Sequence, residues 1–221
     1  MKNSKYEFVD LGLPSGLKWA KWNVGATKLE ESGLYFAWGE DKGYVVTRGE
    51  VIDASNGDYK VEITNEDGTV TTKKFVYDYS DYKHYEDGEF TKYNDTDVLT
   101  TLENEDDGCY LTENSMRIPT KEECEELIEY TDSEWTENYN GSGINGLTLT
   151  SKTNGNSIFV PAVGAVGSRV LYLFGLGGAF WSSSIDHSSV EDAFGFSFYS
   201  GVLDLSGDSR FDGVPLRAVR Q

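Results

Sequence analysis

The chain has 221 residues, which is enough for one well-packed domain with an insertion or for two small domains. We prefer a single domain over residues 1–221. Asp and Glu outnumber Lys and Arg by 38 to 19, which gives a formal charge of -19 at pH 7. Because such a surface repels phosphates, neither nucleic acid nor an anionic lipid surface is expected as a partner.

The amino-terminal residues contain no charged segment followed by an apolar one, and no apolar run approaches the roughly 18 residues of a membrane span. The chain as given is expected to be soluble and not inserted in a membrane, although a secretion signal removed earlier stays open. Cys109 and Cys124 are the only cysteines. They exclude a disulfide framework and a zinc site built from several thiolates, while two reduced thiols and one disulfide are both compatible with the sequence.

In chain order, residues 6–40 come first and predict short strands broken by turns, in "YEFVDLG", "LKWAKWNVG" and "LYFAWGE". The composition changes over residues 42–108, which we interpret as an insertion. Short strands with many glycines between them favour an irregular, loop-rich α+β fold over a repeat architecture.

The insertion carries one hairpin signal, because apolar and polar residues alternate on both sides of Asp67 and Gly68. An Asp-Gly pair between two such runs is typical of a two-residue β-turn. The predicted inserted β-hairpin has Val61 and Ile63 on one strand, facing Val70 and Phe75 on the other.

A helix is predicted after Pro119, where Thr120 and Glu123 have the spacing of a capping box. Its apolar stripe consists of Cys124, Leu127 and Ile128. A second hairpin is predicted around Asn154 and Gly155, and the rest of the chain is expected to be strand and loop.

Catalytic motifs are missing. His84 and His187 lie far apart in the sequence, and neither has a ligand-like neighbour. Ser182 to Ser184 lack the G-x-S-x-G context of a nucleophile, so hydroxyls bonded to backbone beside a buried Trp181 are the better interpretation. No catalytic residue and no cofactor is predicted.

Two acidic segments, residues 93–97 and 103–108, could supply oxygen ligands for calcium. Neither has the spacing that lets one loop wrap the ion, so calcium would require distant loops to converge. We therefore predict no metal site.

Five segments in order, "YEFVDLGLPSGLKWAKWNVGA", "LYFAWGE", "MRIPTKEECEELIEY", "NGNSIFVPAVG" and "FWSSS" followed by "AFGFSFYSG" and "GVPLRAV", resemble the Fibrobacter succinogenes major paralogous domain family. The resemblance extends over residues 6–220. It implies a C-type-lectin-like fold, close to the subgroup of the formylglycine-generating enzymes. It also implies a relation to the variable proteins of diversity-generating retroelements, in which error-prone copying at adenines randomises a ligand-binding surface near the carboxyl terminus.

The sequence departs from two activities known in related folds. Formylglycine-generating enzymes use a reactive cysteine pair near the carboxyl terminus, and this chain has no cysteine after Cys124. The Glu-Pro-Asn, Gln-Pro-Asp and Trp-Asn-Asp motifs of calcium-dependent sugar binding are absent as well. The resemblance therefore implies binding without catalysis.

Diversification of this kind should deplete the variable region in certain residue types, which the sequence can test. An AAC codon mutated at both adenines never encodes Lys, Glu, Gln, Trp or Met. These types make up about a fifth of the chain, so 30 residues should contain about five or six of them. Residues 185–214 contain one, Glu191. A Gly- and Ser-rich β core that disfavours long charged side chains is the alternative explanation.

Residues 181–219 are thus predicted to be a variable region with fixed ends. The expected scaffold includes buried Trp181 and Arg217. The alternation predicts Gly195, Ser197 and Tyr199 outward and Phe196 and Phe198 inward. The predicted ligand-binding residues are Ile185, Asp186, His187, Ser188, Val190, Asp192, Gly195, Ser197, Tyr199, Val202, Leu203, Asp204, Leu205, Ser206, Asp208, Phe211 and Val214, with Leu173, Gly177 and Ala179 as a possible extension.

The leading hypothesis is a non-enzymatic module that displays a diversified surface to a protein or glycan ligand. The alternative is a cell-surface or fimbria-associated structural or adhesion domain without diversification. The resemblance suggests the surface of a cell or a phage particle as the location.

Overall fold

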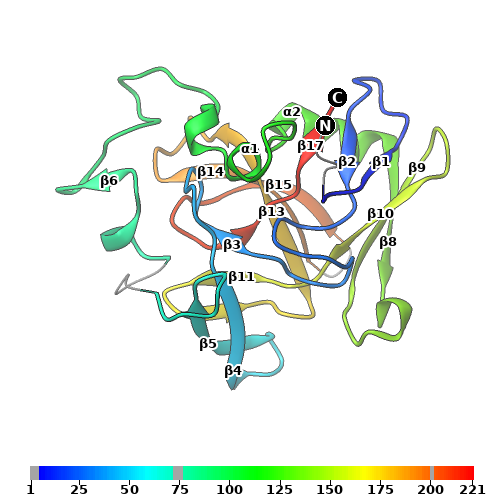
Figure 1. Ribbon diagram of the computed structural model, residues 1–221, viewed down its shortest axis with the longest axis horizontal. Helices are drawn as coiled ribbons and strands as arrows, with labels where there is room; N and C mark the ends of the chain where they lie inside the picture. Colours follow the sequence, from blue (N-terminus) through cyan, green and yellow to red (C-terminus); the bar gives the residue numbers. More distant parts are fainter. Residues whose placement is uncertain (1–4, 72–76, 200–201) are drawn as a thin grey trace.

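The computed structural model describes residues 5–71, 77–199 and 202–221 (Figure 1). These residues form a strand-rich α+β structure with two α-helices, α1 (Gly108–Thr112) and α2 (Lys121–Tyr130). The predicted α+β class is therefore confirmed. The 3-10 turns are η1 (Tyr79–Asp81), η2 (Asn104–Asp106) and η3 (Tyr139–Gly141). The strands are β1 (Phe8–Asp10), β2 (Lys18–Ala20), β3 (Tyr35–Phe36), β4 (Val45–Asp53), β5 (Asp58–Thr64), β6 (Tyr85–Glu86), β7 (Glu89–Phe90), β8 (Thr131–Thr136), β9 (Gly146–Ser151), β10 (Ser157–Pro161), β11 (Ala165–Gly167), β12 (Val170–Tyr172), β13 (Gly177–Ile185), β14 (Asp192–Tyr199), β15 (Val202–Ser209), β16 (Val214–Pro215) and β17 (Val219–Arg220).

The strands form small sheets rather than one large sheet. Among the described residues the strand orders are β1-β2-β17, β10-β9-β8, β11-β12-β5-β4, β13-β14-β15, β16-β3 and β6-β7. The sheet of β13, β14 and β15 is an antiparallel meander whose strands are eight or nine residues long. It lies in the middle of the view in Figure 1, between the hairpin of β4 and β5 and the two helices.

The two ends of the chain are joined by strand pairing. β17 pairs with β2, placing Val219 opposite Trp19. β16 pairs with β3, which places Val214 opposite Phe36. The last residues of the chain are thus held by the first forty.

Helix α2 begins as the sequence predicted. The Thr120 hydroxyl accepts a hydrogen bond from the Glu123 backbone N–H, and the Glu123 carboxylate accepts one from the Thr120 N–H, which completes the capping box. Arg117 donates to the same Glu123 carboxylate at 2.7 Å. Cys124 and Leu127 are buried against the core, as the apolar stripe required.

The hairpin inside the insertion lies earlier in the chain than predicted. β4 pairs with β5 across a turn at residues 54–57, and the other edge of β5 pairs with β12. The turn at Asp67 and Gly68 exists but is followed by one isolated bridge, between Thr64 and Val70.

The predicted partners of that hairpin are wrong for a tertiary reason. Ile63 and Val61 pack against β11 and β12 in a core cluster, while Val70 is 80% exposed. Phe75, the fourth predicted residue, lies outside the described residues. The alternating pattern identified β5 correctly but could not show which segment pairs with it.

The second predicted hairpin is confirmed. β9 and β10 pair in register, with Thr150 opposite Ser157. The turn between them contains Asn154 and Gly155, and Gly155 has a φ of +74°, a conformation that glycine adopts without strain.

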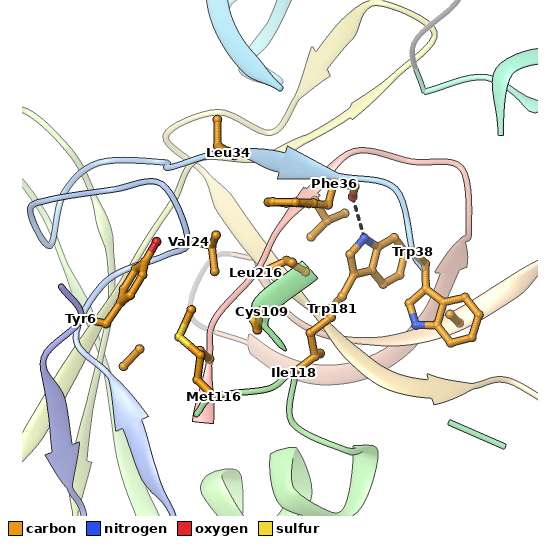
Figure 2. Packing of buried hydrophobic residues seen from close by; sticks show 14 of the residues in the cluster. Tyr6, Val24, Leu34, Phe36, Trp38, Cys109, Met116, Ile118, Trp181 and Leu216 are labelled. Atoms are coloured by element: carbon orange, nitrogen blue, oxygen red, sulfur yellow. Dashed lines mark hydrogen bonds between the residues drawn. The ribbon is translucent and has the colours of Figure 1, made fainter. Parts of the chain in front are cut away.

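Three clusters of buried apolar side chains make up the core. The first lies between β2, β3 and α1 and the strands β13 and β16, which stand at the two ends of the carboxyl-terminal segment, residues 181–219. Figure 2 shows Trp181 and Leu216 in this cluster beside Cys109. The second packs α2, β9 and β10 against one face of the β13-β14-β15 sheet. The third lies beneath the hairpin of β4 and β5.

Both cysteines are buried and free, which decides between the two states that the sequence allowed. Cys109 lies in the first cluster and Cys124 in the second. Burial raises the pKa of both thiols well above the usual value, so they pack as small apolar groups.

Candidate ligand-binding surface

The two ends of the carboxyl-terminal segment are fixed by buried polar bonds. The Trp181 indole N–H donates to the Phe36 carbonyl at 2.9 Å, as the dashed line in Figure 2 shows. Arg217 is fully buried and donates to the carbonyls of Ala20 and Phe159. The predicted burial of Trp181 and Arg217 is therefore confirmed. Burial also lowers the pKa of Arg217 to about 9.

A second buried arginine holds the middle of the segment. Arg210 donates to the carbonyls of Lys92, Tyr93 and Val190, and its guanidinium lies 4.9 Å from the centre of the Trp38 ring. It thereby ties the end of β15 to the loop before β14.

The serines after Trp181 are structural in this geometry. Ser182, Ser183 and Ser184 are all buried. The Ser184 hydroxyl accepts a hydrogen bond from the Lys121 backbone N–H at 3.0 Å, beside the start of α2. The Ser182 carbonyl accepts one from the Trp38 indole at 2.8 Å.

The β13-β14-β15 sheet has two different faces. Phe180, Phe196 and Phe198 point into the second core cluster, and the rings of Phe180 and Phe196 stack with centres 4.5 Å apart. On the opposite face, Ala179, Ser197 and Asp204 lie side by side across the three strands. Tyr199 and Val202 are paired next to them and are exposed.

This second face lines a groove of about 590 Å³. Five of the predicted binding residues contribute to its wall, together with two residues of the proposed upstream extension. They are Ser197, Tyr199, Val202, Asp204 and Asp208, with Leu173 and Ala179. Gly164 and Ala165, from the segment before and at the start of β11, also line the groove, and Gly164 is bridged to Gly178 of β13.

The groove is apolar at one end and acidic at the other. Leu173, Tyr199 and Val202 are among the exposed large apolar side chains of the described chain. Exposed apolar groups gathered at a concave site are typical of binding surfaces.

The acidic end contains carboxyl groups without a cation. Burial, followed by the charges of Asp192 and Asp204, raises the pKa of Asp208 to about 6. Burial, with the charges of Asp208 and Asp192, raises the pKa of Asp212 to about 7. Among the described residues, no ion pair includes Asp204, Asp208 or Asp212.

The loop before β14 presents other predicted residues to solvent. His187 and Ser188 are exposed, and Asp186 accepts a hydrogen bond from the Ser188 backbone N–H at 2.8 Å. Val190 is half-buried and gives its carbonyl to Arg210. Asp192, also half-buried, begins β14. These residues lie beside the groove but do not line it.

Several predicted binding residues belong to the core instead. Ile185 is 4% exposed and Val214 1% exposed, and both pack in the first cluster. Gly195 is buried as well, because Trp181 packs beside it. The predicted alternation places Gly195 on the same face as Ser197 and Tyr199, but Gly195 is not exposed there.

Three further residues are only partly available. Leu203 and Leu205 pack against the second cluster opposite Phe198 and Phe196, since they lie on the core-facing side of β15. Phe211 packs in the third cluster with its ring centre 4.1 Å from that of Tyr79. Ser206 is half-buried, and its hydroxyl lies 3.1 Å from the Ser197 hydroxyl.

The two acidic segments, for which no metal site was predicted, lie near Lys92 and Asn94. Glu103, Glu105 and Asp106 gather their carboxylates, and within the described ranges they are the one group with three close metal-type ligands. The Lys92 ammonium contacts all three, at 2.7, 2.9 and 2.6 Å. Asp97, in the other segment, accepts a backbone hydrogen bond from Asn94.

His84 is buried beside this group. Its Nε2 lies 3.5 Å from the Asp106 carboxylate and 3.3 Å from the Gly39 carbonyl. Burial lowers its pKa to about 4, so the ring is neutral at pH 7. The other histidine, His187, lies in the loop before β14, and the two do not meet in one site.

Sequence reasoning missed Gly164 and Ala165, which line the groove, and Asp212. Gly164 ends the quoted segment "NGNSIFVPAVG" and Ala165 follows it, but nothing in that segment shows that the two residues lie beside β13. Asp212 belongs to the Asp-rich segment, but nothing local shows that it faces Asp208.

Comparisons with models of protein families, with curated proteins and with solved structures found no significant match. In the described part of the chain, no helix is long and apolar enough to cross a membrane.

Proposed function

We propose that this chain is a non-enzymatic binding module on a C-type-lectin-like scaffold, with the groove face of the β13-β14-β15 sheet as its diversified ligand-binding surface. One observation carries the proposal. Ser197, Tyr199, Val202, Asp204 and Asp208, all from the segment depleted in five residue types, line one groove.

The division between fixed and displayed residues supports this function. Trp181, Arg210 and Arg217 are fully buried and bonded to backbone far away in the sequence. Side chains on the groove face can then change without loss of these bonds. Such a division is what a surface with exchangeable residues requires.

The burial of other predicted residues favours the second candidate. Ile185 and Val214 lie in the depleted segment and pack in the core. If β-core packing explains the depletion, the chain is a cell-surface or fimbria-associated adhesion domain without diversification. The groove would then bind one fixed ligand.

A pair of libraries tests the tolerance that the proposal requires. The first randomises the five groove residues together, and the control randomises Ala193, Phe196, Phe198, Leu203 and Leu205 on the same strands. We expect most members of the first library and few of the second to be folded, measured as the protease-resistant fraction. Equal losses in both would contradict a displayed surface.

The gene locus distinguishes the two candidates. Diversification requires a near-identical copy of the 3′ end, rich in AAC or AAT codons, next to a reverse transcriptase gene. An intact locus with neither would leave the adhesion domain as the function.

A further inference from the structure

The acidic end of the groove contains carboxylates that no cation of the described chain pairs with. Asp204 and Asp208 line the groove, and Asp212 lies close enough for the charge of Asp208 to act on it. None of the three takes part in an ion pair of the described residues. Asp208 and Asp212 are partly buried, whereas Asp204 is exposed. The unpaired charges of the two partly buried carboxylates weaken the free protein, because burial of a charge is costly unless it is paired.

A bare metal ion does not fit this arrangement. Where three carboxylates of the described chain come within ligand distance of one another, they are Glu103, Glu105 and Asp106, not the groove residues. Within the described chain, the groove carboxylates do not form a group of three ligands close enough to enclose one ion. A cation on a long, flexible arm can reach them from outside.

The neighbouring walls indicate what carries this cation. Leu173, Tyr199 and Val202 offer exposed apolar surface at the other end of the same groove. A neutral glycan can donate hydroxyl hydrogen bonds to the carboxylates but brings no positive charge, and an acidic glycan would be repelled by them. A ligand with a lysine or arginine beside apolar side chains can pair with the carboxylates at one end of the groove and pack against the apolar side chains at the other.

We infer that the groove binds a segment of a partner protein that places a lysine or arginine side chain against Asp204 and Asp208 and an apolar side chain against Tyr199 and Val202. The inference rests on the proposed binding function and adds the chemistry of the ligand. The formal charge of -19 acts in the same direction, because it attracts a basic partner from a distance.

Selection of displayed random peptides on the immobilised full chain tests this ligand class. We expect the enriched peptides to carry Lys or Arg close to an apolar residue. For such a peptide, the Kd should rise by about tenfold or more in the double variant Asp204→Asn, Asp208→Asn, since a charge-assisted bond is lost. The control double variant Asp95→Asn, Asp132→Asn changes the net charge equally at exposed positions outside the groove.

The pH dependence gives an independent readout. The groups that act on Asp208 are Asp192, Asp204 and Asp212, all of them acidic. Binding of the selected peptide should tighten from pH 5 to pH 8 as Asp208 and Asp212 lose their protons. The Asp208→Asn variant should show a smaller change, and its melting temperature confirms that it is folded.

The possible failures are distinguishable. Peptides without Lys or Arg that still require Tyr199 and Val202 would overturn the inference and leave the proposed function standing. Equal weakening by both double variants would overturn it too, because long-range charge would then suffice. If no enriched peptide depends on any groove residue, the proposed function fails as well.

Discussion

In two acidic regions of this molecule, the pKa of an aspartate side chain is shifted in opposite directions. Asp106 accepts hydrogen bonds from Lys83, Lys92 and the Tyr93 hydroxyl. Burial alone would raise its pKa, but the bonds from Lys83, Lys92 and the Tyr93 hydroxyl, with the effect of His84, together outweigh burial and lower the pKa to about 2. Asp208 is partly buried among other acids, and its pKa is raised to about 6. The first region pairs its carboxylate with cations, while Asp208 has no ion pair among the described residues.

This difference distinguishes paired carboxylates from unpaired ones in a chain that is acidic throughout. Net charge gives the same weight to every carboxylate. Stability falls when a paired carboxylate is removed and rises when an unpaired one is removed, so substitutions distinguish the two regions.

Removal of the Asp106 charge should have the largest effect. The Asp106→Asn variant leaves two lysines without their shared partner and should lose about 2–4 kcal/mol of unfolding free energy at pH 7, less than a fully buried pair because the lysines reach solvent. Urea unfolding measures this loss. The Asp95→Asn variant is the control and should be unchanged.

The pH dependence of that loss has a definite sign. Because the Asp106 pKa in the folded protein is about 2, below the usual 3.8, its stabilisation is present above pH 3.8 and disappears as the pH falls toward 2. The two proteins should therefore converge in acid. A difference that persisted at the lowest pH would mean that Asp106 acts through packing instead of charge.

Asp208 should behave in the opposite way. Its pKa of about 6 lies above the usual 3.8, so the stability gained from protonation is present below pH 3.8 and is lost as the pH rises through 6. Asp208→Asn should thus gain about 1 kcal/mol at pH 8, a value reduced for partial solvent screening, and almost nothing at pH 4. Thermal unfolding at both pH values checks it, and a destabilised variant at pH 8 would show that the carboxylate has a structural partner.

Local patterns predicted the parts of the fold that local chemistry decides. Thr120 and Glu123 cap a helix wherever it packs, and Asn154 and Gly155 turn a hairpin without help from the rest of the chain. The alternation placed Phe196 and Phe198 in the core and Ser197 on the other face.

The sequence could not show which elements pack over one another. Ile185 and Val214 belong to a segment with exposed neighbours, but Phe36 and Trp38 share their core cluster. Likewise, β5 pairs with β4 and β12 and not with the segment after Gly68. Asp106 is paired and Asp208 is not, because the fold brings Lys83 and Lys92 to Asp106.

Neutral changes on the groove face should have a small effect on stability. His187→Asn, Tyr199→Ser and Val202→Ser together should shift the unfolding free energy by less than about 1.5 kcal/mol, because each exposed position contributes within about 0.5. Phe211 is left out since it packs against Tyr79. The matched control Phe196→Ser should unfold the sheet, and a loss of similar size in the triple variant would show that the groove face is part of the core.

Chelation of metal ions should have the smallest effect on stability, because of the contacts around Asp106. The ammonium of Lys92 contacts Glu103, Glu105 and Asp106, so the position that a calcium ion would take among them already holds a positive charge. The melting temperature should therefore be the same in a chelator and in millimolar calcium. Lys92→Met removes the ammonium and leaves three carboxylates within ligand distance of one another. Calcium should then raise the melting temperature of this variant alone. A wild-type protein that loses stability in chelator and regains it with calcium would show that the ion, and not Lys92, balances these carboxylates.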